Sequence, residues 1–385
     1  MSFAFNHSRA SILGIGTALP NHVIAQSDII EILASSLQNQ PDLARFARRI
    51  FKSCGVETRY TCEPDFLKPS ESCRYLPSDD RSRIPTTEER MNTYKRESLP
   101  LAVEAAQKAL ADANIRPGDI THLIPVSCTG QFLPGLDVML IQNLGLSPRI
   151  HRLPLIFQGC AAGLKAIQFS RDIVQGAPES QVLIVCVELC TLHLQPVMKR
   201  EALFAASFFG DGASSCVIGS ARQDRTHYLQ LGSGYSVLLP DSTEDMTWEV
   251  GNTGFDLYLS PRIPKLLGSY LLPELELLLA GDELPELWAI HPGGRGIVDS
   301  VQKVLNLRED QTKYSRDILK NAGNLSSVTI MFVLDAMRRE LQSAGSLSKE
   351  GVALAFGPGL TAELMRFRYV SSSTSDLTEP EHANL

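Results

Sequence analysis

Two kinds of apolar segment alternate along the chain. Short continuous apolar runs, such as residues 122–127 and 181–188, are typical of strands buried on both faces. Between them lie segments with apolar residues at positions i, i+3 and i+4, such as residues 99–111, which are typical of helices with one buried face. This alternation of strands and helices predicts an α/β fold.

One supersecondary pattern occurs twice. Residues 122–144 and 288–305 each show an apolar run, a loop with glycine and proline, and a helical segment. We interpret this as an internal pseudo-duplication and expect an N-terminal half at residues 1–225 and a C-terminal half at residues 226–370. Residues 371–385 are rich in Ser, Thr and Glu, which predicts a disordered tail.

Composition narrows the class of protein. With 44% hydrophobic and 21% charged residues, the chain can build a large core, and its net charge of −7 argues against a nucleic-acid or anionic-membrane surface. No apolar run is long enough for a membrane span, and the N-terminus does not resemble a signal peptide. Eight scattered cysteines without a CxxC pair indicate reduced thiols, not disulfides or a zinc site. We therefore expect a cytoplasmic protein.

Cys160 is the first candidate for chemistry. It lies where the apolar run 153–157 meets the helical segment 164–169, so we expect its sulfur to face a helix N-terminus. Unpaired N–H groups and the helix dipole favour the thiolate there, which is the nucleophilic form of cysteine. The alternative is a buried structural cysteine, which is common in intracellular proteins.

His291 and Asn324 are further candidates. His291 ends an apolar run and precedes Pro292-Gly293-Gly294, and α/β sheets place chemistry at such strand ends. Asn324 precedes a long helical segment. A structural histidine and a helix N-cap are the alternatives. Together, however, a thiol, an imidazole and a carboxamide meet the needs of nucleophilic acyl transfer, namely a nucleophile, its partner and a second donor for the oxyanion. The order Cys, His, Asn also occurs in papain-like proteases, so the order alone does not decide the reaction.

The sequence around these residues resembles the chalcone synthase superfamily, the type III polyketide synthases. Five motifs carry the resemblance in order: Gln158-Gly159-Cys160, Phe209-Gly210-Asp211-Gly212-Ala213, His291-Pro292-Gly293-Gly294, Gly323-Asn324-Leu325-Ser326-Ser327 and Phe356-Gly357-Pro358-Gly359-Leu360. The resemblance covers about residues 11–367. It implies a thiolase-like fold with five αβαβα layers and a homodimer with one active site per subunit.

The resemblance also implies an acyltransferase reaction. Cys160 takes a starter acyl group from coenzyme A, and malonyl-CoA loses CO2 and attacks the resulting thioester. His291 stabilises the thiolate, and His291 and Asn324 donate hydrogen bonds to the thioester oxygen of malonyl-CoA, where charge develops. Coenzyme A thioesters are the substrates, and the reaction requires neither a metal nor a redox cofactor.

The resemblance further implies which residues bind the substrate. Phe209 matches a gatekeeper phenylalanine, for which a core aromatic is the alternative. Leu257 falls at the second gatekeeper position when the chain is aligned by Pro264, and Phe255 is the rival. The remaining positions are cavity residues by the same resemblance: Cys128, Cys190, His193, Ser326, Gly357, Pro358, Gly359 and Leu133, which falls where a methionine reaches across the dimer interface. For Cys128 and Cys190 the alternative is small core filler, and for Gly357-Pro358-Gly359 a simple turn.

The chain departs from the plant enzymes in two respects. Residues 187–193 and 127–130 resemble bacterial members, including alkylpyrone and alkylresorcinol synthases. Val56-Glu57-Thr58 stand where the plant enzymes place basic residues near the CoA phosphates. Arg48, Arg49 and Lys52 are candidate substitutes, although charged helix faces are usually only solvated.

The sequence thus predicts a type III polyketide synthase that extends a medium- or long-chain fatty acyl-CoA with malonyl-CoA and cyclises the product to a pyrone or a phenolic compound. Aromatic starters and malonyl-CoA itself rank next. The alternative is a ketosynthase of the same fold that accepts chains from a carrier protein or joins two acyl chains.

Overall fold

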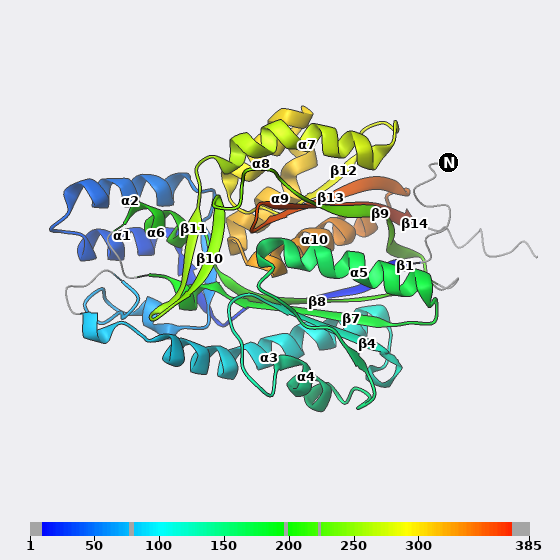
Figure 1. Cartoon of the computed structure of the whole chain (residues 1–385), viewed down its shortest axis with the longest axis horizontal. Helices are drawn as coiled ribbons and strands as arrows, with labels where there is room; N and C mark the ends of the chain where they lie inside the picture. The colour runs from blue at the N-terminus through cyan, green and yellow to red at the C-terminus, as the bar shows by residue number, and fades with distance from the viewer. Residues whose placement is uncertain (1–9, 77–80, 196–198, 222–224, 372–385) are drawn as a thin grey trace, which may run out of the picture.

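The computed structural model describes residues 10–76, 81–195, 199–221 and 225–371. The predicted disordered tail therefore lies almost entirely outside the described residues. Within them, one ten-stranded sheet runs through the molecule with the order β12-β13-β14-β9-β1-β8-β7-β4-β5, and β6 also pairs with β4. Figure 1 shows this sheet between layers of helices.

The two halves of the sheet repeat one topology. The repeated elements of the first half are β1 (Ala10–Ala18), α3 (Thr87–Ala113), β4 (His122–Ser127), α4 (Leu136–Leu144), α5 (Ala162–Gly176), β7 (Val182–Leu189) and β8 (Asp211–Ser220). Their counterparts are β9 (His227–Leu238), α7 (Ile263–Leu279), β12 (Leu287–Ile290), α8 (Arg295–Leu305), α10 (Thr329–Ser343), β13 (Lys349–Gly357) and β14 (Thr361–Ser371).

Strand directions repeat as well. β4 runs parallel to β7, β7 antiparallel to β8, and β8 antiparallel to β1. β12, β13, β14 and β9 follow the same sequence of directions. The halves meet where β1 pairs with β9 through Ser11↔Gln230 and Ile12↔Leu229. The predicted pseudo-duplication is therefore present, and the division near residue 225 remains a prediction.

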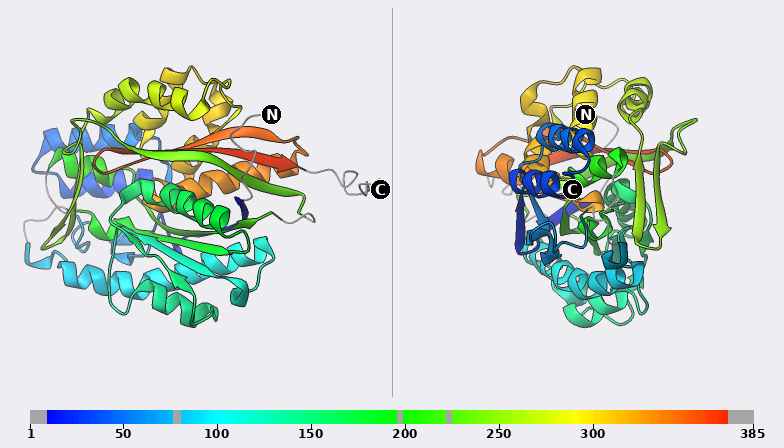
Figure 2. Two further views of the ribbon diagram at one scale, coloured as in Figure 1. Left: turned by 45° about the vertical axis from the view of Figure 1, so that its right-hand side comes forward. Right: turned by 90° about the vertical axis from the view of Figure 1, so that its left-hand side faces the viewer.

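Helices cover both faces of both halves, which gives five layers. α3 and α4 pack on the outer face of the first half, and α7 and α8 pack on the outer face of the second. α5 and α10 contact strands of both halves and form the middle layer, as Figure 2 also shows. α3 lies so close to β1 that a Cβ on Gly16 would be 2.2 Å from the Ala105 carbonyl oxygen, so this position requires glycine.

Burial on both faces explains the continuous apolar runs in the sequence. In β7, Leu183, Val185 and Val187 belong to the core beneath α3, whereas the alternating residues Val182, Ile184 and Cys186 face the middle layer. Side chains alternate between the faces of a strand, so a strand covered on both sides must be apolar at every position.

The remaining elements include the two short edge strands β5 and β6 and the segments that connect the repeated elements. The helices and strands are β2 (His22–Ala25), α1 (Gln26–Ser36), α2 (Pro41–Ser53), β3 (Thr58–Thr61), β5 (His151–Arg152), β6 (Leu155–Ile156), α6 (Arg200–Ala206), β10 (Met246–Gly251), β11 (Gly254–Leu259) and α9 (Glu309–Ala322). The 3-10 turns are η1 (Pro64–Leu67), η2 (Arg81–Arg83), η3 (Pro117–Asp119), η4 (Gly159–Ala161), η5 (Cys190–His193) and η6 (Ser326–Val328). Within the described residues, no helix is both long and apolar enough to cross a membrane.

Candidate active site

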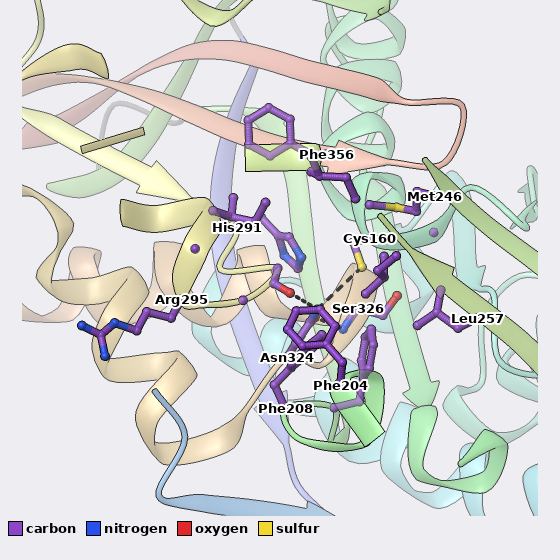
Figure 3. A pocket seen from close by; sticks show the side chains of 18 of the residues that line it. Cys160, Phe204, Phe208, Met246, Leu257, His291, Arg295, Asn324, Ser326 and Phe356 are labelled. Carbon is purple, nitrogen blue, oxygen red and sulfur yellow. Dashed lines mark hydrogen bonds between the residues drawn. The ribbon is translucent and has the colours of Figure 1, made fainter. Parts of the chain in front are cut away.

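A cavity of about 450 Å³ lies beyond the carboxyl ends of three strands. Cys128 follows β4, Cys190 follows β7 and His291 follows β12, and all three line the cavity. Strand carboxyl ends are where open α/β sheets bind ligands. Cys160, Asn324, Ser326, Phe209, Leu257 and Pro358, all singled out from the sequence, also line it. Figure 3 shows several of these side chains around the Cys160 sulfur.

The backbone around Cys160 explains its motif. Cys160 lies in η4, one turn before α5 begins at Ala162. Gly159 has φ +61°, and a Cβ there would lie 2.4 Å from Cδ of Pro358. The glycine is therefore required both for its left-handed backbone and for the close approach of the 357–359 turn. Phe157 also has a positive φ of 52°, which is costly for a non-glycine residue and common near functional sites.

The amide of Asn324 is oriented by its own backbone surroundings. Its Oδ1 accepts a hydrogen bond from the Ser326 N–H at 2.8 Å, so its Nδ2 faces the cavity. Nδ2 donates to the Gly293 carbonyl at 3.1 Å and lies 3.9 Å from the Cys160 sulfur. One N–H of Asn324 is thus held by the loop after β12, and the other points toward the thiol (Figure 3).

His291 comes directly after β12. Its backbone N–H donates to the Leu354 carbonyl at 2.7 Å, which continues the pairing with β13. The side chain is buried, and neither ring nitrogen has a hydrogen-bond partner among the described residues. The ring projects into the cavity on the side of Cys160 (Figure 3). An unsatisfied buried imidazole is costly, which indicates that the ring is placed for a ligand.

Burial controls the charges in this site. It raises the pKa of the Cys160 thiol to about 11, although contacts with Ser326 and Asn324 act in the opposite direction. It also lowers the pKa of His291 to about 3. Both shifts favour neutral side chains, because each charge alone loses its hydration. The helix N-terminus, from which the sequence predicts a thiolate, acts against this effect of burial, and the thiolate stays a prediction.

Glu188 is a buried carboxylate that the sequence analysis did not identify. Its oxygens accept hydrogen bonds from the Ser327 hydroxyl, from the Thr129 hydroxyl at 2.7 Å and from the Cys128 N–H at 3.1 Å. It thereby joins the loop after β4 to η6. Burial raises the pKa of Glu188, and these hydrogen bonds partly compensate. A single acid inside the apolar run 182–189 was the available signal, since acids are rarely fully buried without partners.

The outer end of the cavity is formed by helices. Ile50 and Ser53 of α2, Phe204 of α6 and Arg295 of α8 line it. Arg48, Arg49 and Lys52, the candidate substitutes for the CoA contacts, are exposed on the same helix α2.

Four predicted substrate-binding residues do not line the cavity. Gly357 and Gly359 flank Pro358, which does line it. His193 is buried behind the wall and stacks on Phe255, with ring centroids 4.2 Å apart. Leu133 is 92% exposed in the single chain.

The sequence offers two residues for the second gatekeeper position, Leu257 and Phe255. Leu257 lines the cavity, whereas Phe255 is buried next to His193. Met246 and Trp248 also line the cavity, and the sequence analysis did not identify them. Among the described residues no group of three or more His, Cys, Asp or Glu side chains could hold a metal ion.

Comparison with known proteins gives consistent matches. Residues 2–222 match the model of the N-terminal domain of chalcone and stilbene synthases, and residues 230–371 match that of the C-terminal domain. The chain is 32% identical over 366 residues to "Alpha-pyrone synthesis polyketide synthase-like Pks18" from Mycobacterium tuberculosis, covering 93% of this chain and 91% of that protein.

Two further matches extend this result. The chain is 28% identical over 368 residues to "Probable polyketide synthase 1" from Dictyostelium discoideum, of which it spans only 11%. The crystal structure of PKS-I from the brown alga Ectocarpus siliculosus superposes with a TM-score of 0.86 at 26% identity, covering 94% of this chain and 98% of that one.

Proposed function

The chain belongs to the chalcone and stilbene synthase family, the type III polyketide synthases, and has their thiolase-like fold; we propose that it condenses malonyl-CoA with a starter acyl-CoA at Cys160. The observation that carries the proposal is the convergence of Cys160, His291 and Asn324 on one cavity, with the Asn324 amide 3.9 Å from the sulfur. These groups come from three separate segments of the chain.

In the first step the starter acyl group moves to the protein. The Cys160 sulfur attacks the carbonyl carbon of the acyl-CoA, and the carbon–sulfur bond to coenzyme A breaks. The thiol proton passes through His291 to the departing coenzyme A sulfur. Because burial keeps both residues neutral at rest, we infer that proton transfer accompanies the attack.

In the second step malonyl-CoA loses CO2. The electron pair of the broken carbon–carbon bond moves into an enolate, whose negative charge lies largely on the thioester oxygen. N–H groups of His291 and Asn324 placed at that oxygen stabilise the charge without needing to reorganise. The enolate carbon then attacks the Cys160 thioester, and the Cys160 sulfur departs as a thiolate, which takes up a proton from solvent through His291. The chemistry is an acyl transfer that requires neither a metal nor a redox cofactor.

The cavity walls support a fatty acyl starter. Met246, Leu257 and Leu259 present apolar side chains along one wall, and Phe204 and Phe208 line the outer part. Apolar walls stabilise an alkyl chain by removing its surface from water. The apolar walls thus support a medium- or long-chain fatty acyl starter, and the similarity to a protein named for alpha-pyrone synthesis supports a pyrone over a phenolic product.

One assay tests these statements together. Purified protein is incubated with radiolabelled malonyl-CoA and fatty acyl, coumaroyl and malonyl starters, and the products are identified by mass. We expect labelled products with fatty acyl-CoA and none from a Cys160→Ala variant, with Cys73→Ala as a cysteine control outside the cavity. Turnover with coumaroyl-CoA alone would contradict the starter class, and polyketide formation by Cys160→Ala would contradict the mechanism.

We also propose a homodimer. β5 lies at the edge of the sheet, and Leu133, Leu153 and Ile156 expose apolar side chains in the segments before and after it. An uncovered sheet edge with apolar neighbours favours association with a second subunit. Light scattering is expected to give twice the chain mass, and Leu133→Asp is expected to shift the protein toward monomer. A monomeric wild-type protein would refute the dimer.

A second candidate function rests on one comparison. A similar segment forms 11% of a far longer polyketide synthase, so chains of this family can act as parts of larger assemblies. A carrier protein could then deliver the starter. Comparing acyl-CoA with the same acyl group on a carrier protein distinguishes the two, since preferential turnover of the carrier-bound chain would favour this alternative.

A further inference from the structure

The β10–β11 hairpin forms one wall of the cavity without joining the main sheet. Its strands pair with each other in the register Met246↔Leu259 and Trp248↔Leu257, and within the described residues neither strand pairs with another. All four of these side chains line the cavity. Figure 2 shows the hairpin as a separate ribbon beside the body of the molecule. The position of this wall therefore depends on what holds the hairpin.

Polar contacts hold the hairpin tip. The Thr87 N–H donates to the Asn252 carbonyl at 2.9 Å, and the Thr87 hydroxyl accepts from the Gly254 N–H, also at 2.9 Å. Gln195 Nε2 donates to the Thr253 carbonyl at 3.1 Å. These contacts attach the turn, but they lie beyond the part of the hairpin that faces the cavity.

His193 supplies a contact closer to the cavity. Its Nδ1 accepts a hydrogen bond from the Phe255 N–H at 3.0 Å, and its Nε2 donates to the Thr129 carbonyl at 2.6 Å. The two bonds fix the ring as the neutral form protonated at Nε2. The ring is also stacked on Phe255 at an interplanar angle of 11°. Burial lowers the pKa of His193 to about 3, which keeps the ring neutral and able to accept the Phe255 bond.

A second bond joins the same two segments. The Trp248 indole N–H donates to the Cys128 carbonyl at 2.8 Å, next to the Thr129 carbonyl that His193 contacts. The loop after β4 is thus linked to both strands of the hairpin, directly through Trp248 and indirectly through His193.

We propose that His193 is a positioning residue that fixes the β10–β11 hairpin against the loop after β4, and that it thereby sets the shape of the wall that selects the starter acyl group. This inference rests on the proposed function for its substrate, but not for the contact itself. It differs from the sequence-based expectation, in which His193 faces the substrate directly.

Substitutions separate the two hydrogen bonds of His193. His193→Phe keeps a ring beside Phe255 and removes both bonds. His193→Asn places an amide oxygen near the position of Nδ1 and can retain the bond to Phe255, whereas His193→Gln places a donor near Nε2 and can retain only the bond to Thr129. If the hairpin is fixed by the Phe255 bond, Asn should rescue more than Gln.

The first readout does not require turnover. The chain contains two tryptophans, and the difference between the spectra with and without a Trp248→Phe substitution isolates the emission of Trp248. We expect a red shift and stronger acrylamide quenching of Trp248 in His193→Phe and His193→Gln, and values near wild type in His193→Asn. Unchanged emission and quenching in His193→Phe would overturn the proposal.

The second readout is starter selectivity. Release of the wall should reduce the ratio of kcat/KM between the best and the poorest fatty acyl-CoA by about tenfold, mainly through KM, as expected for losing interactions of this kind. An unchanged ratio, or global unfolding of His193→Phe by circular dichroism, would show that His193 is not a selectivity-positioning residue. If the wild-type protein makes no polyketide from any starter, the proposed function fails while the fluorescence still decides whether His193 holds the hairpin.

Discussion

The backbones of Phe209 and Asn324 form a bridge between the two halves of the molecule. The Asn324 N–H donates to the Phe208 carbonyl at 2.7 Å, and the Gly210 N–H donates to the Asn324 carbonyl at 3.0 Å. Buried Arg59 donates to the Phe209 carbonyl at 2.9 Å from the other side. The proposed gatekeeper and the proposed amide donor therefore belong to one hydrogen-bonded unit, although 115 positions separate them in the sequence.

A side chain at position 323 should disturb this hydrogen-bonded unit. The φ of Gly323, +77°, suits glycine, and a Cβ there would lie 2.5 Å from the Phe208 carbonyl oxygen that Asn324 bonds. We expect Gly323→Ala to reduce the free energy of unfolding by about 1–3 kcal/mol in urea and to slow malonyl-CoA decarboxylation. Gly345→Ala is the matched control, because Gly345 has φ +60° with no atom within 4 Å of the added Cβ. Equal effects of both substitutions on decarboxylation would contradict the coupling.

The amide of Asn324 should matter as a donor. Asn324→Asp keeps an oxygen that can accept from the Ser326 N–H, and it replaces the Nδ2 donor with an acceptor. We expect the rate of CO2 release from malonyl-CoA to fall by a factor of about 100 to 1000, the usual effect of losing one oxyanion donor. Acylation of Cys160, followed by intact mass, should fall less. Equal losses in the two steps would argue that Asn324 serves only the structure of the site.

The ionisation of Cys160 should be visible in its alkylation. With a pKa of about 11, about one thiol in 10,000 is ionised at pH 7, so labelling by iodoacetamide should rise about tenfold per pH unit from pH 7 to 10. Mass spectrometry of the Cys160 peptide measures this rate. A rate that is already at a plateau near pH 7, and that His291→Gln abolishes, would instead indicate a thiolate–imidazolium pair.

Leu257 should limit the size of the starter. Leu257 is the cross-strand neighbour of Trp248 in the cavity wall, and Leu257→Phe adds volume to that wall. The larger side chain should leave less room for the acyl chain, so kcat/KM for long acyl-CoAs should fall by about tenfold relative to short ones. Tyr258→Phe is the control, since Tyr258 is the next residue of the strand and is absent from the cavity lining. A uniform loss for every chain length would contradict a role in selectivity.

Much of this protein could be predicted from its sequence. The α/β class could be predicted because apolar runs and helical periodicity record which faces are buried. The thiolase-like fold, which the resemblance implied, is confirmed by the family and structure matches. Cys160, His291 and Asn324 were recognisable because glycine and proline beside them mark tight turns at element ends. Their catalytic roles and a cytoplasmic location remain predictions.

Only the tertiary structure decided how the site is assembled. Whether Leu257 or Phe255 faces the cavity depends on the pairing of β10 with β11, because both lie on the same face of β11 and a shift of two residues would place Phe255 opposite Trp248. The proposed role of His193 depends on Thr129 and Phe255, which lie 64 and 62 positions away in the sequence. The raised pKa of Cys160 depends on how completely distant segments exclude water from it. Local sequence specifies which side chains can react, whereas long-range packing sets their dielectric surroundings and their partners.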